Sequence, residues 1–289
     1  MSESIIADFF GDAYIEGITD EPTECRVLLS ESKLLLATED HQTTIELESV
    51  FDVDVTEVPT ELRPFFKNAI TIAYEDDTVE GKAVIEGDDE DIERFTTVLF
   101  KSLLNGTPVR VEHPARRGGR VTNVDPRSAE LFVRDDHVTF TELDEPFRIR
   151  LDSVSNFERT QRDLGELPAS LAVTIQHFPE GTELTTNLVV PTARKLRLLG
   201  RYLTQRYDAV IEELTDIDLS DDEMETLVGL YSGPNDIHIS KVVDIDASRV
   251  SMVLNRLQEK DLVTTVEDSM ALTGRGRILV RDRIESVNQ

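Results

Sequence analysis

Side chains that could carry out chemistry are sparse in this sequence of 289 residues, and their spacing is unfavourable. No two of the five histidines lie three or four residues apart, so the helical spacing of a zinc-binding pair is missing. Cys25 is the only cysteine and cannot form a thiolate metal site or an intrachain disulfide. The GxSxG, GxxxxGK[ST] and GxGxxG motifs are also missing. We therefore expect a protein that is not an enzyme and that needs no metal or cofactor.

Acidic residues are so frequent in this chain that a pair of carboxylates is no evidence of a catalytic site. Asp and Glu number 58 against 30 Lys and Arg, which gives a net charge of −28 at pH 7. The acids occur along the whole chain, and arginine outnumbers lysine by 23 to 7. Both features are typical of a halophile that accumulates salt in its cytosol, where molar salt screens charges over about 3 Å. Specificity for a basic partner is the alternative. Stretches that depart from this acidic background are therefore the most informative.

No apolar run approaches the length of a membrane span. One of the longest runs covers residues 34–37, whereas a transmembrane helix needs about 20 apolar residues. The first residues lack the basic start and the apolar stretch of a signal peptide. We therefore expect a cytoplasmic protein with no membrane insertion.

The first two thirds of the chain contain an internal repeat. Three blocks of similar residues recur in the same order at an offset of 103 or 104 residues: 43–53 with 147–157, 69–72 with 172–175, and 92–99 with 196–203. Because the order and the spacing both agree, the pattern predicts a duplicated module.

Each copy combines alternating strands with one closing helix. Apolar and polar residues alternate with period two in segments such as 33–37, which favours half-buried antiparallel strands. Helices are expected over 88–104 and 191–207. Strands followed by one helix give the element order of a pleckstrin-homology (PH)-like barrel, and another small α+β sandwich stays open. The expected boundaries are 1–113 for the first module, 114–120 for a linker containing Gly118–Gly119, and 121–213 for the second module.

The pattern changes to helices in residues 216–289. Ser220 and Glu223 form a capping-box signature before a helix expected over 220–232. A short helix is expected over 238–243, a third helix from Asp246 or Ser248 to Lys260, two strands over 262–266 and 270–272, and a last helix over 275–287. This is the order of a winged helix-turn-helix domain. The sequence thus predicts an α+β protein with two PH-like β-barrel or sandwich modules, each closed by a C-terminal helix, and a winged helix.

A winged helix raises the question of DNA binding. Arg249, Asn255, Arg256 and Lys260 on its third helix have suitable chemistry for bases and phosphates. Residues 216–289, however, contain 8 Lys and Arg against 15 Asp and Glu, whereas DNA-binding domains usually present a basic face. The charge favours protein contact or dimerisation over DNA contact.

One stretch departs clearly from the acidic background. Residues 184–207 contain no Asp or Glu, and at helical spacing Arg194, Arg197 and Arg201 lie opposite the apolar side of their helix. We expect a solvent-facing arginine stripe. It would either rest on an acidic neighbouring domain or bind an acidic partner, since Arg pairs carboxylates bidentately. The expected partner-binding residues are Arg194, Arg197, Arg201, Arg249, Arg256 and Lys260.

The whole chain resembles the archaeal taxis protein family CheF, in a halophilic version. The resemblance lies in the start at Glu3-Ser-Ile-Ile-Ala-Asp-Phe, the duplicated strand-rich body, and the winged-helix end with Leu272-Thr-Gly-Arg-Gly. It implies an adaptor between the response regulator CheY, in its phosphorylated form, and the cytosolic accessory proteins of the archaellum motor, with other chemotaxis proteins as further partners. A transcription regulator that binds DNA through the winged helix is the alternative, and a homodimer stays open.

Overall fold

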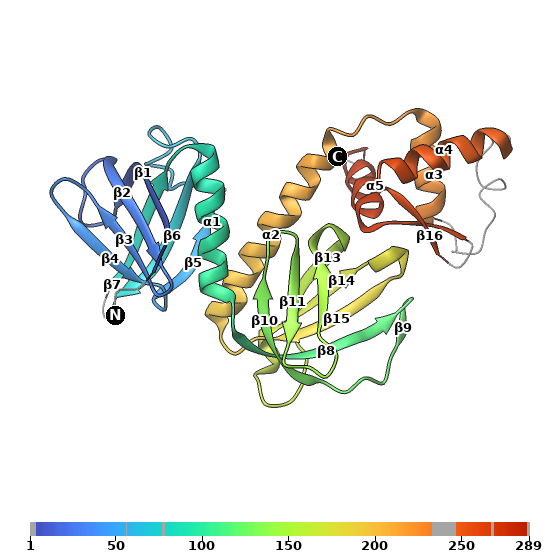
Figure 1. The fold of residues 1–289 in the computed structure, drawn as a ribbon, viewed down its shortest axis with the longest axis horizontal. Coiled ribbons are helices and arrows are strands. Elements are labelled where there is room, and N and C mark those ends of the chain that lie inside the picture. Colours follow the sequence, from blue (N-terminus) through green and yellow to red (C-terminus); the bar gives the residue numbers. More distant parts are fainter. Residues whose placement is uncertain (1–3, 56, 77–78, 233–246, 267–268, 288–289) are drawn as a thin grey trace. The chain divides into compact units, whose positions relative to one another are not determined.

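The first β module is an antiparallel sheet of seven strands followed by one helix (Figure 1). Its strand order is β4-β3-β2-β1-β7-β6-β5. In β2 and β3, alternate residues such as Val27, Leu29, Leu34 and Leu36 are fully buried, as the period-two pattern predicts. The strands are β1 Ile5–Ile15, β2 Thr23–Ser30, β3 Lys33–Ala37, β4 Gln42–Glu46, β5 Val50–Asp54, β6 Ala69–Asp76 and β7 Val79–Glu86. The computed structural model describes residues 4–55, 57–76, 79–232, 247–266 and 269–287.

Strand β1 pairs with β2 through its first part and with β7 through its end. Gly11 lies where the two pairings meet, and a Cβ atom there would stand 2.0 Å from the carbonyl oxygen of Glu86. Only glycine allows this close approach of two strands. The sheet can therefore curve around its core at this position.

Helix α1, Asp89–Leu104, packs its apolar side on this sheet. Phe95 is fully buried, with its ring centroid 5.4 Å from that of Phe9 in β1. The helix begins with three acidic residues, which suit the positive end of its dipole. It ends at Asn105 and Gly106, and Gly106 has a φ of +71°. Both ends agree with the sequence-based expectation.

The second β module repeats this topology. Its strand order is β12-β11-β10-β8-β15-β14-β13, with β9 added beside β8, so each main strand corresponds to one strand of the first module. The offset of 104 residues also holds, because β5 begins at Val50 and β13 at Val154. The strands are β8 Thr107–Arg117, β9 Arg120–Val121, β10 Arg127–Val133, β11 His137–Thr141, β12 Phe147–Arg150, β13 Val154–Thr160, β14 Ala172–His177 and β15 Leu184–Val189.

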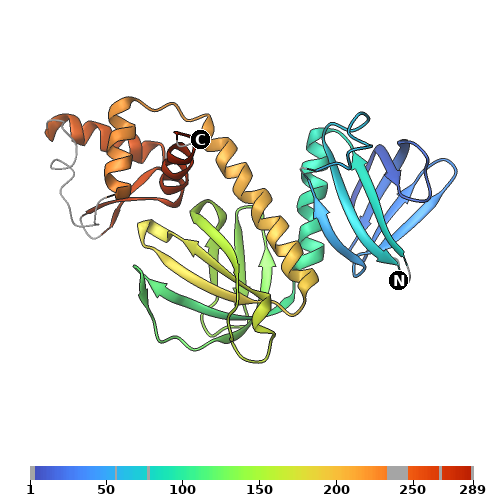
Figure 2. The same cartoon turned by 180° about the vertical axis from the view of Figure 1, so that it is seen from behind.

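The stretch expected to be a linker, 114–120, is instead part of a β-hairpin. Strand β8 runs to Arg117, Gly118 and Gly119 form the turn, and β9 follows at Arg120 (Figure 2). The reason is local: a Gly-Gly pair with positive φ at both residues closes a two-residue hairpin. Short 3-10 helices lie at Leu151–Ser153 (η1), Ala169–Leu171 (η2) and Pro179–Gly181 (η3).

Helix α2, Ala193–Thr215, begins where the repeat predicts and is longer than expected. It continues past Tyr207 because Val210 and Leu214 extend its apolar side into the core of the C-terminal module. That module consists of α3 Asp221–Ser232, α4 Ala247–Glu259, β16 Val263–Val266, β17 Ser269–Leu272 and α5 Gly274–Val287. The short helix expected over 238–243 lies outside the described residues.

The chain divides into two compact units. Unit 1 contains residues 1–108, 130–135 and 190–205, and unit 2 contains 109–129, 136–189 and 206–289. The first β module and the first half of α2 thus belong to unit 1. Most of the second β module belongs to unit 2 together with the C-terminal module, so contacts between these two are contacts within one unit.

Candidate interaction sites

Arg201 of α2 is bound to two carboxylates of strand β5 inside unit 1. Its Nε and Nη2 atoms lie 3.0 and 3.1 Å from the two carboxylate oxygens of Asp52, and its Nη1 lies 2.6 Å from Asp54. The Asp54 side chain is only 11% exposed, so this pairing is partly shielded from water. The hydrogen bonds that Arg201 donates to Asp52, together with the negative charge of Asp52, raise the pKa of Arg201.

The other two arginines of the expected stripe also contact the first β module. Arg194 donates hydrogen bonds to the backbone carbonyls of Leu47 and Val50, at the start of β5. The guanidinium of Arg197 lies 5.5 Å from the ring centroid of Phe51. Burial lowers the pKa of Arg194. The stripe therefore faces solvent only in part: Arg197 is exposed, whereas Arg194 and Arg201 are half-buried, and the contacts of all three are those of the intramolecular alternative.

The capping box expected at the start of α3 is present and extends into an ion pair. The backbone N–H of Ser220 donates to the Glu223 carboxylate at 2.8 Å, and Lys260 Nζ lies 3.0 Å from both oxygens of Glu223. The Glu223 side chain is 4% exposed. Burial alone would raise the pKa of Glu223, but the hydrogen bonds from Ser220 and Lys260 outweigh it and lower the pKa. Lys260 is thus bound within the C-terminal module.

Arg249 and Arg256 of α4 have different surroundings. Arg249 pairs with Asp222 of α3, Nη2 to Oδ2 at 2.5 Å. Arg256 is exposed on the same side of α4 as Met252, whose side chain is 56% exposed. Among the six residues expected to bind a partner, Arg256 therefore has the most accessible guanidinium group.

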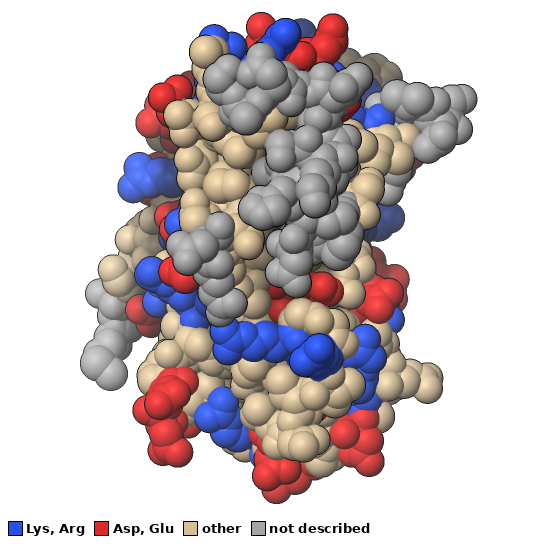
Figure 3. Space-filling view, turned by 90° about the vertical axis from the view of Figure 1, so that its right-hand side faces the viewer, with Lys and Arg blue, Asp and Glu red and all other residues tan. Residues whose placement is uncertain are grey.

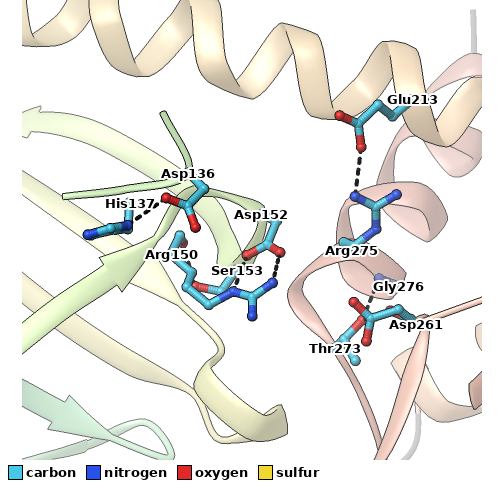
Figure 4. Close-up of polar contacts among 10 residues, drawn as sticks. All are labelled: Asp136, His137, Arg150, Asp152, Ser153, Glu213, Asp261, Thr273, Arg275 and Gly276. Atoms are coloured by element: carbon cyan, nitrogen blue, oxygen red, sulfur yellow. Dashed lines mark hydrogen bonds and ion pairs between the residues drawn. The ribbon is translucent and has the colours of Figure 1, made fainter. Parts of the chain in front are cut away.

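A pocket of about 400 Å³ lies within unit 2, between η1 and η3 of the second β module and the β16–β17 hairpin and α5 of the C-terminal module. Figure 4 shows its ion pairs: Arg150 binds Asp152 beside η1, and Arg275 binds Glu213 at 2.9 Å. The Ser153 hydroxyl donates to the Arg150 carbonyl at 2.6 Å. These groups are satisfied locally, and they form no nucleophile–base pair among the described lining residues.

Glycines bring the two sides of this pocket together. A Cβ atom at Gly274, the first residue of α5, would lie 2.3 Å from the Cα of Ser153 in η1. A Cβ atom at Gly181 in η3 would lie 2.9 Å from Val266 in β16. In addition, the Arg277 guanidinium lies 4.1 Å from the ring centroid of Phe178, and Arg281 donates to the Ser155 carbonyl at 2.7 Å. The C-terminal module is therefore packed closely on the second β module.

Two histidines lie close together in the second β module, His177 buried and His113 half-buried. The Thr186 hydroxyl lies 2.7 Å from Nδ1 of His113 and 3.1 Å from Nε2 of His177. Because a hydroxyl carries one proton, Thr186 donates to only one of the rings and accepts from the other. Burial lowers the pKa of His113 to about 4 and that of His177 to about 3, so both are neutral near pH 7. The sequence gives no sign of this group, since the histidines are far apart along the chain.

The β8–β9 hairpin, which occupies the stretch expected to be a linker, carries three arginines at the surface. Arg116, Arg117 and Arg120 are all exposed on it. Figure 3 views the molecule from the side on which this hairpin ends in Figure 1, and Lys and Arg side chains gather in a band across that face.

Within the described ranges, no group of three or more His, Cys, Asp or Glu side chains is arranged to hold a metal ion. No helix in the same ranges has the length and apolarity needed to cross a membrane.

Comparisons with known proteins give consistent matches. A family model described as "Archaeal Chemotaxis signal transduction system protein F" matches residues 5–209, and a domain of unknown function matches 218–285. Taxis protein CheF2 of Halobacterium salinarum is 41% identical over 289 residues, which cover 100% of both chains. Taxis protein CheF1 of the same organism is 24% identical over 263 residues, covering 90% of this chain and 88% of CheF1. A Spt16D–Pob3N heterodimer structure aligns over 60% of this chain and 86% of its own at a TM-score of 0.24 and 13% identity, and supports no argument.

Proposed function

The chain belongs to the archaeal chemotaxis signal transduction protein F family, CheF, and from this membership we propose that it is a non-enzymatic adaptor between CheY and the archaellum motor. A role in chemotaxis signal transduction follows from the family itself. The observation that carries the finer proposal is the full-length match to a taxis protein. In the proposed mechanism, phosphorylated CheY binds one surface in the cytoplasm and motor accessory proteins bind another. For the two binding events to be coupled, phosphorylated CheY must bind the chain more tightly when the chain is engaged with the motor than when it is free.

The proposal includes an assignment of the modules. The two β modules are PH-like barrels, a view supported by their identical strand orders and by the helix that follows each of them. The C-terminal module is a winged helix, supported by the order α3, α4, β16, β17 and α5. Such modules offer several surfaces to which partners can dock.

The exposed side of α4 is the proposed partner surface of the winged helix. Met252, Asn255 and Arg256 all lie on it and are exposed. An exposed Met beside an Arg suits a protein interface, in which both residue types are enriched. Arg194, Arg197 and Arg201, by contrast, bind within unit 1, so a role for them in partner binding would require release of those contacts.

DNA binding by α4 has less support. Arg249 and Lys260, two of its basic residues, are held by Asp222 and Glu223. Binding through phosphate contacts would make the affinity fall steeply with salt. Fluorescence anisotropy of labelled duplex DNA over a salt series distinguishes the two functions, and specific nanomolar binding to a promoter would favour a transcription regulator.

The adaptor proposal is tested with purified proteins in molar KCl. The tagged chain is incubated with CheY, with and without acetyl phosphate, and with the motor accessory proteins. We expect retention of phosphorylated CheY together with at least one accessory protein, weakened by Arg256→Glu and unchanged by Arg159→Glu, which alters an exposed arginine of β13. Retention of neither partner by the wild-type chain would refute the proposal. Sedimentation of the same samples gives the stoichiometry and decides whether the chain dimerises.

A further inference from the structure

The β8–β9 hairpin concentrates positive charge in a strongly acidic chain. The sequence contains no Asp or Glu between Glu112 and Asp125, although acids outnumber bases 58 to 30 overall. Arg116, Arg117 and Arg120 fall in this interval, and all six residues from Arg116 to Val121 are exposed. A local excess of arginine is therefore presented to solvent.

Two of these arginines face each other. In the register of the hairpin, Arg117 is directly opposite Arg120, and Arg116 is directly opposite Val121. Residues directly opposite in an antiparallel pair lie on the same side of the sheet, and like charges in that position destabilise it. None of the carboxylates that the structure describes forms an ion pair with any of the three arginines. The pair thus costs stability within the folded chain.

The hairpin holds this charge in a fixed geometry. Gly118 and Gly119 adopt φ angles of +55° and +74°, and an added Cβ would meet nothing within 4 Å at either residue. The backbone N–H of Gly118 donates to the Glu183 carbonyl at 2.9 Å, and that of Thr122 donates to the Ala115 carbonyl at 3.0 Å. The tip is therefore open to solvent while its base is anchored to the sheet.

Protection of a sheet edge is a simpler explanation for charged residues at this position. It does not explain their sign, because the surface of this chain is acidic elsewhere and Asp or Glu would protect the edge equally well. It also does not explain a like-charge pair, since a single charge is sufficient. The arrangement is understandable if the missing negative charge comes from another molecule.

We propose that the β8–β9 hairpin docks onto a carboxylate-rich face of a partner protein. Arg117 and Arg120 together bind carboxylates of the partner, and each planar guanidinium donates two parallel hydrogen bonds to a carboxylate. Arg116 and Val121, a residue that is 71% exposed, lie on the opposite side of the hairpin.

Carboxylates fit this surface better than nucleic acid does. Binding to a polyanion depends on counterion release and weakens sharply as salt rises, whereas direct Arg–carboxylate pairs act at contact distance. The guanidinium groups of Arg117 and Arg120, on one side of a short hairpin, suit a small acidic face.

The inference rests on the proposed function only for the choice of protein probes. Arg120→Glu places a negative charge opposite Arg117, so we expect the midpoint temperature of thermal unfolding to stay the same or rise. Because the variant also loses one guanidinium group of the docking pair, we expect its affinity for the partner to fall about tenfold. Arg159→Glu with Arg162→Glu is the matched control, since both arginines are exposed elsewhere in the second β module. The probes are purified CheY, the motor accessory proteins and a labelled octaglutamate peptide, all followed by fluorescence anisotropy in molar KCl.

Each outcome decides the inference. Loss of binding to a protein probe and to the peptide in Arg120→Glu, but not in the control, supports it. If the wild-type chain binds CheY or a motor protein and Arg120→Glu binds equally well, the hairpin inference is overturned while the adaptor function stands. If no taxis protein binds, the adaptor function fails and the peptide alone decides the inference. Tighter binding to duplex DNA than to the peptide, or a hairpin-dependent dimer in sedimentation, would replace the partner-protein assignment.

Discussion

The guanidinium of Arg201 binds both oxygens of the Asp52 carboxylate, at 3.0 and 3.1 Å, and thereby joins helix α2 to strand β5. The two residues are 149 positions apart in the sequence. This pairing directs the basic side of α2 toward the first β module. It accounts for the acid-free first part of α2, up to Tyr207, in an acidic chain: the arginines of this part have carboxylates and carbonyls of the same unit to bind.

Loss of this clamp should destabilise unit 1. We expect Arg201→Ala to lower the free energy of unfolding by about 1–2 kcal/mol, because it removes charge-assisted hydrogen bonds from two carboxylates at a partly exposed site. The measurement is guanidinium denaturation in molar KCl. Arg94→Ala, which truncates an exposed arginine of α1, should change stability by less than about 0.5 kcal/mol. Equal effects of the two substitutions would mean that the clamp contributes nothing.

Lys260 and Glu223 should behave as a partly buried pair, since the carboxylate is 4% exposed and the lysine side chain 30%. Lys260→Met leaves the carboxylate without its cation, and we expect a loss of about 1–3 kcal/mol. Lys260→Met combined with Glu223→Gln should restore a large part of this loss, since the buried charge is removed as well. A double-mutant cycle on unfolding free energies measures the coupling. Additive losses would contradict the ion pair.

The same pair predicts a pH dependence. The pKa of Glu223 is lowered in the folded state, so its contribution to stability is complete above the unfolded value near 4.5 and is lost as the pH falls toward the folded value. Wild type should therefore lose more stability than Glu223→Gln when the pH is lowered through this range. Parallel denaturation curves for the two proteins across the range would contradict the assignment.

The two histidines of the second β module predict a second pH dependence, in a higher window. His113 and His177 have pKa values lowered from 6.5 to about 4 and about 3, so the unfolded chain binds protons that the folded chain does not. Their contribution is complete above pH 6.5 and is lost as the pH falls toward 4 and 3. We expect His177→Asn to flatten the fall in unfolding free energy between these values. An unchanged slope would show that the histidines titrate normally.

Much of the fold could be predicted from the sequence because its signals are local or repeated. The offset of 104 residues located the second module correctly, since β13 and α2 begin 104 residues after β5 and α1. Asn105–Gly106 marked the end of α1, and Ser220 with Glu223 marked the start of α3. These elements depend on residues that are neighbours in the chain.

The interaction sites depend on contacts that the sequence does not encode locally. Helical periodicity placed Arg194, Arg197 and Arg201 on one side of α2, but only the tertiary structure sets β5 against that side. The β8–β9 hairpin has a visible signal in Gly118–Gly119, but Pro114 and the paired glycines are equally typical of a linker, and the strand after them has only two residues. Its unpaired arginines become meaningful only once the register places Arg117 opposite Arg120.

Two glycines should respond oppositely to alanine. A Cβ at Gly274 would lie 2.3 Å from the Cα of Ser153 and 2.7 Å from the carbonyl oxygen of Asp152, both of them backbone atoms that cannot move aside. Gly200, within α2, has nothing within 4 Å of its Cβ position. We expect Gly274→Ala to destabilise the protein by about 2 kcal/mol or more, through overpacking, and Gly200→Ala to stabilise it by about 0.5–1 kcal/mol. Hydrogen exchange should show faster exchange in η1 and α5 for Gly274→Ala alone. If those segments exchange as in wild type, the C-terminal module does not rest on the second β module through this contact.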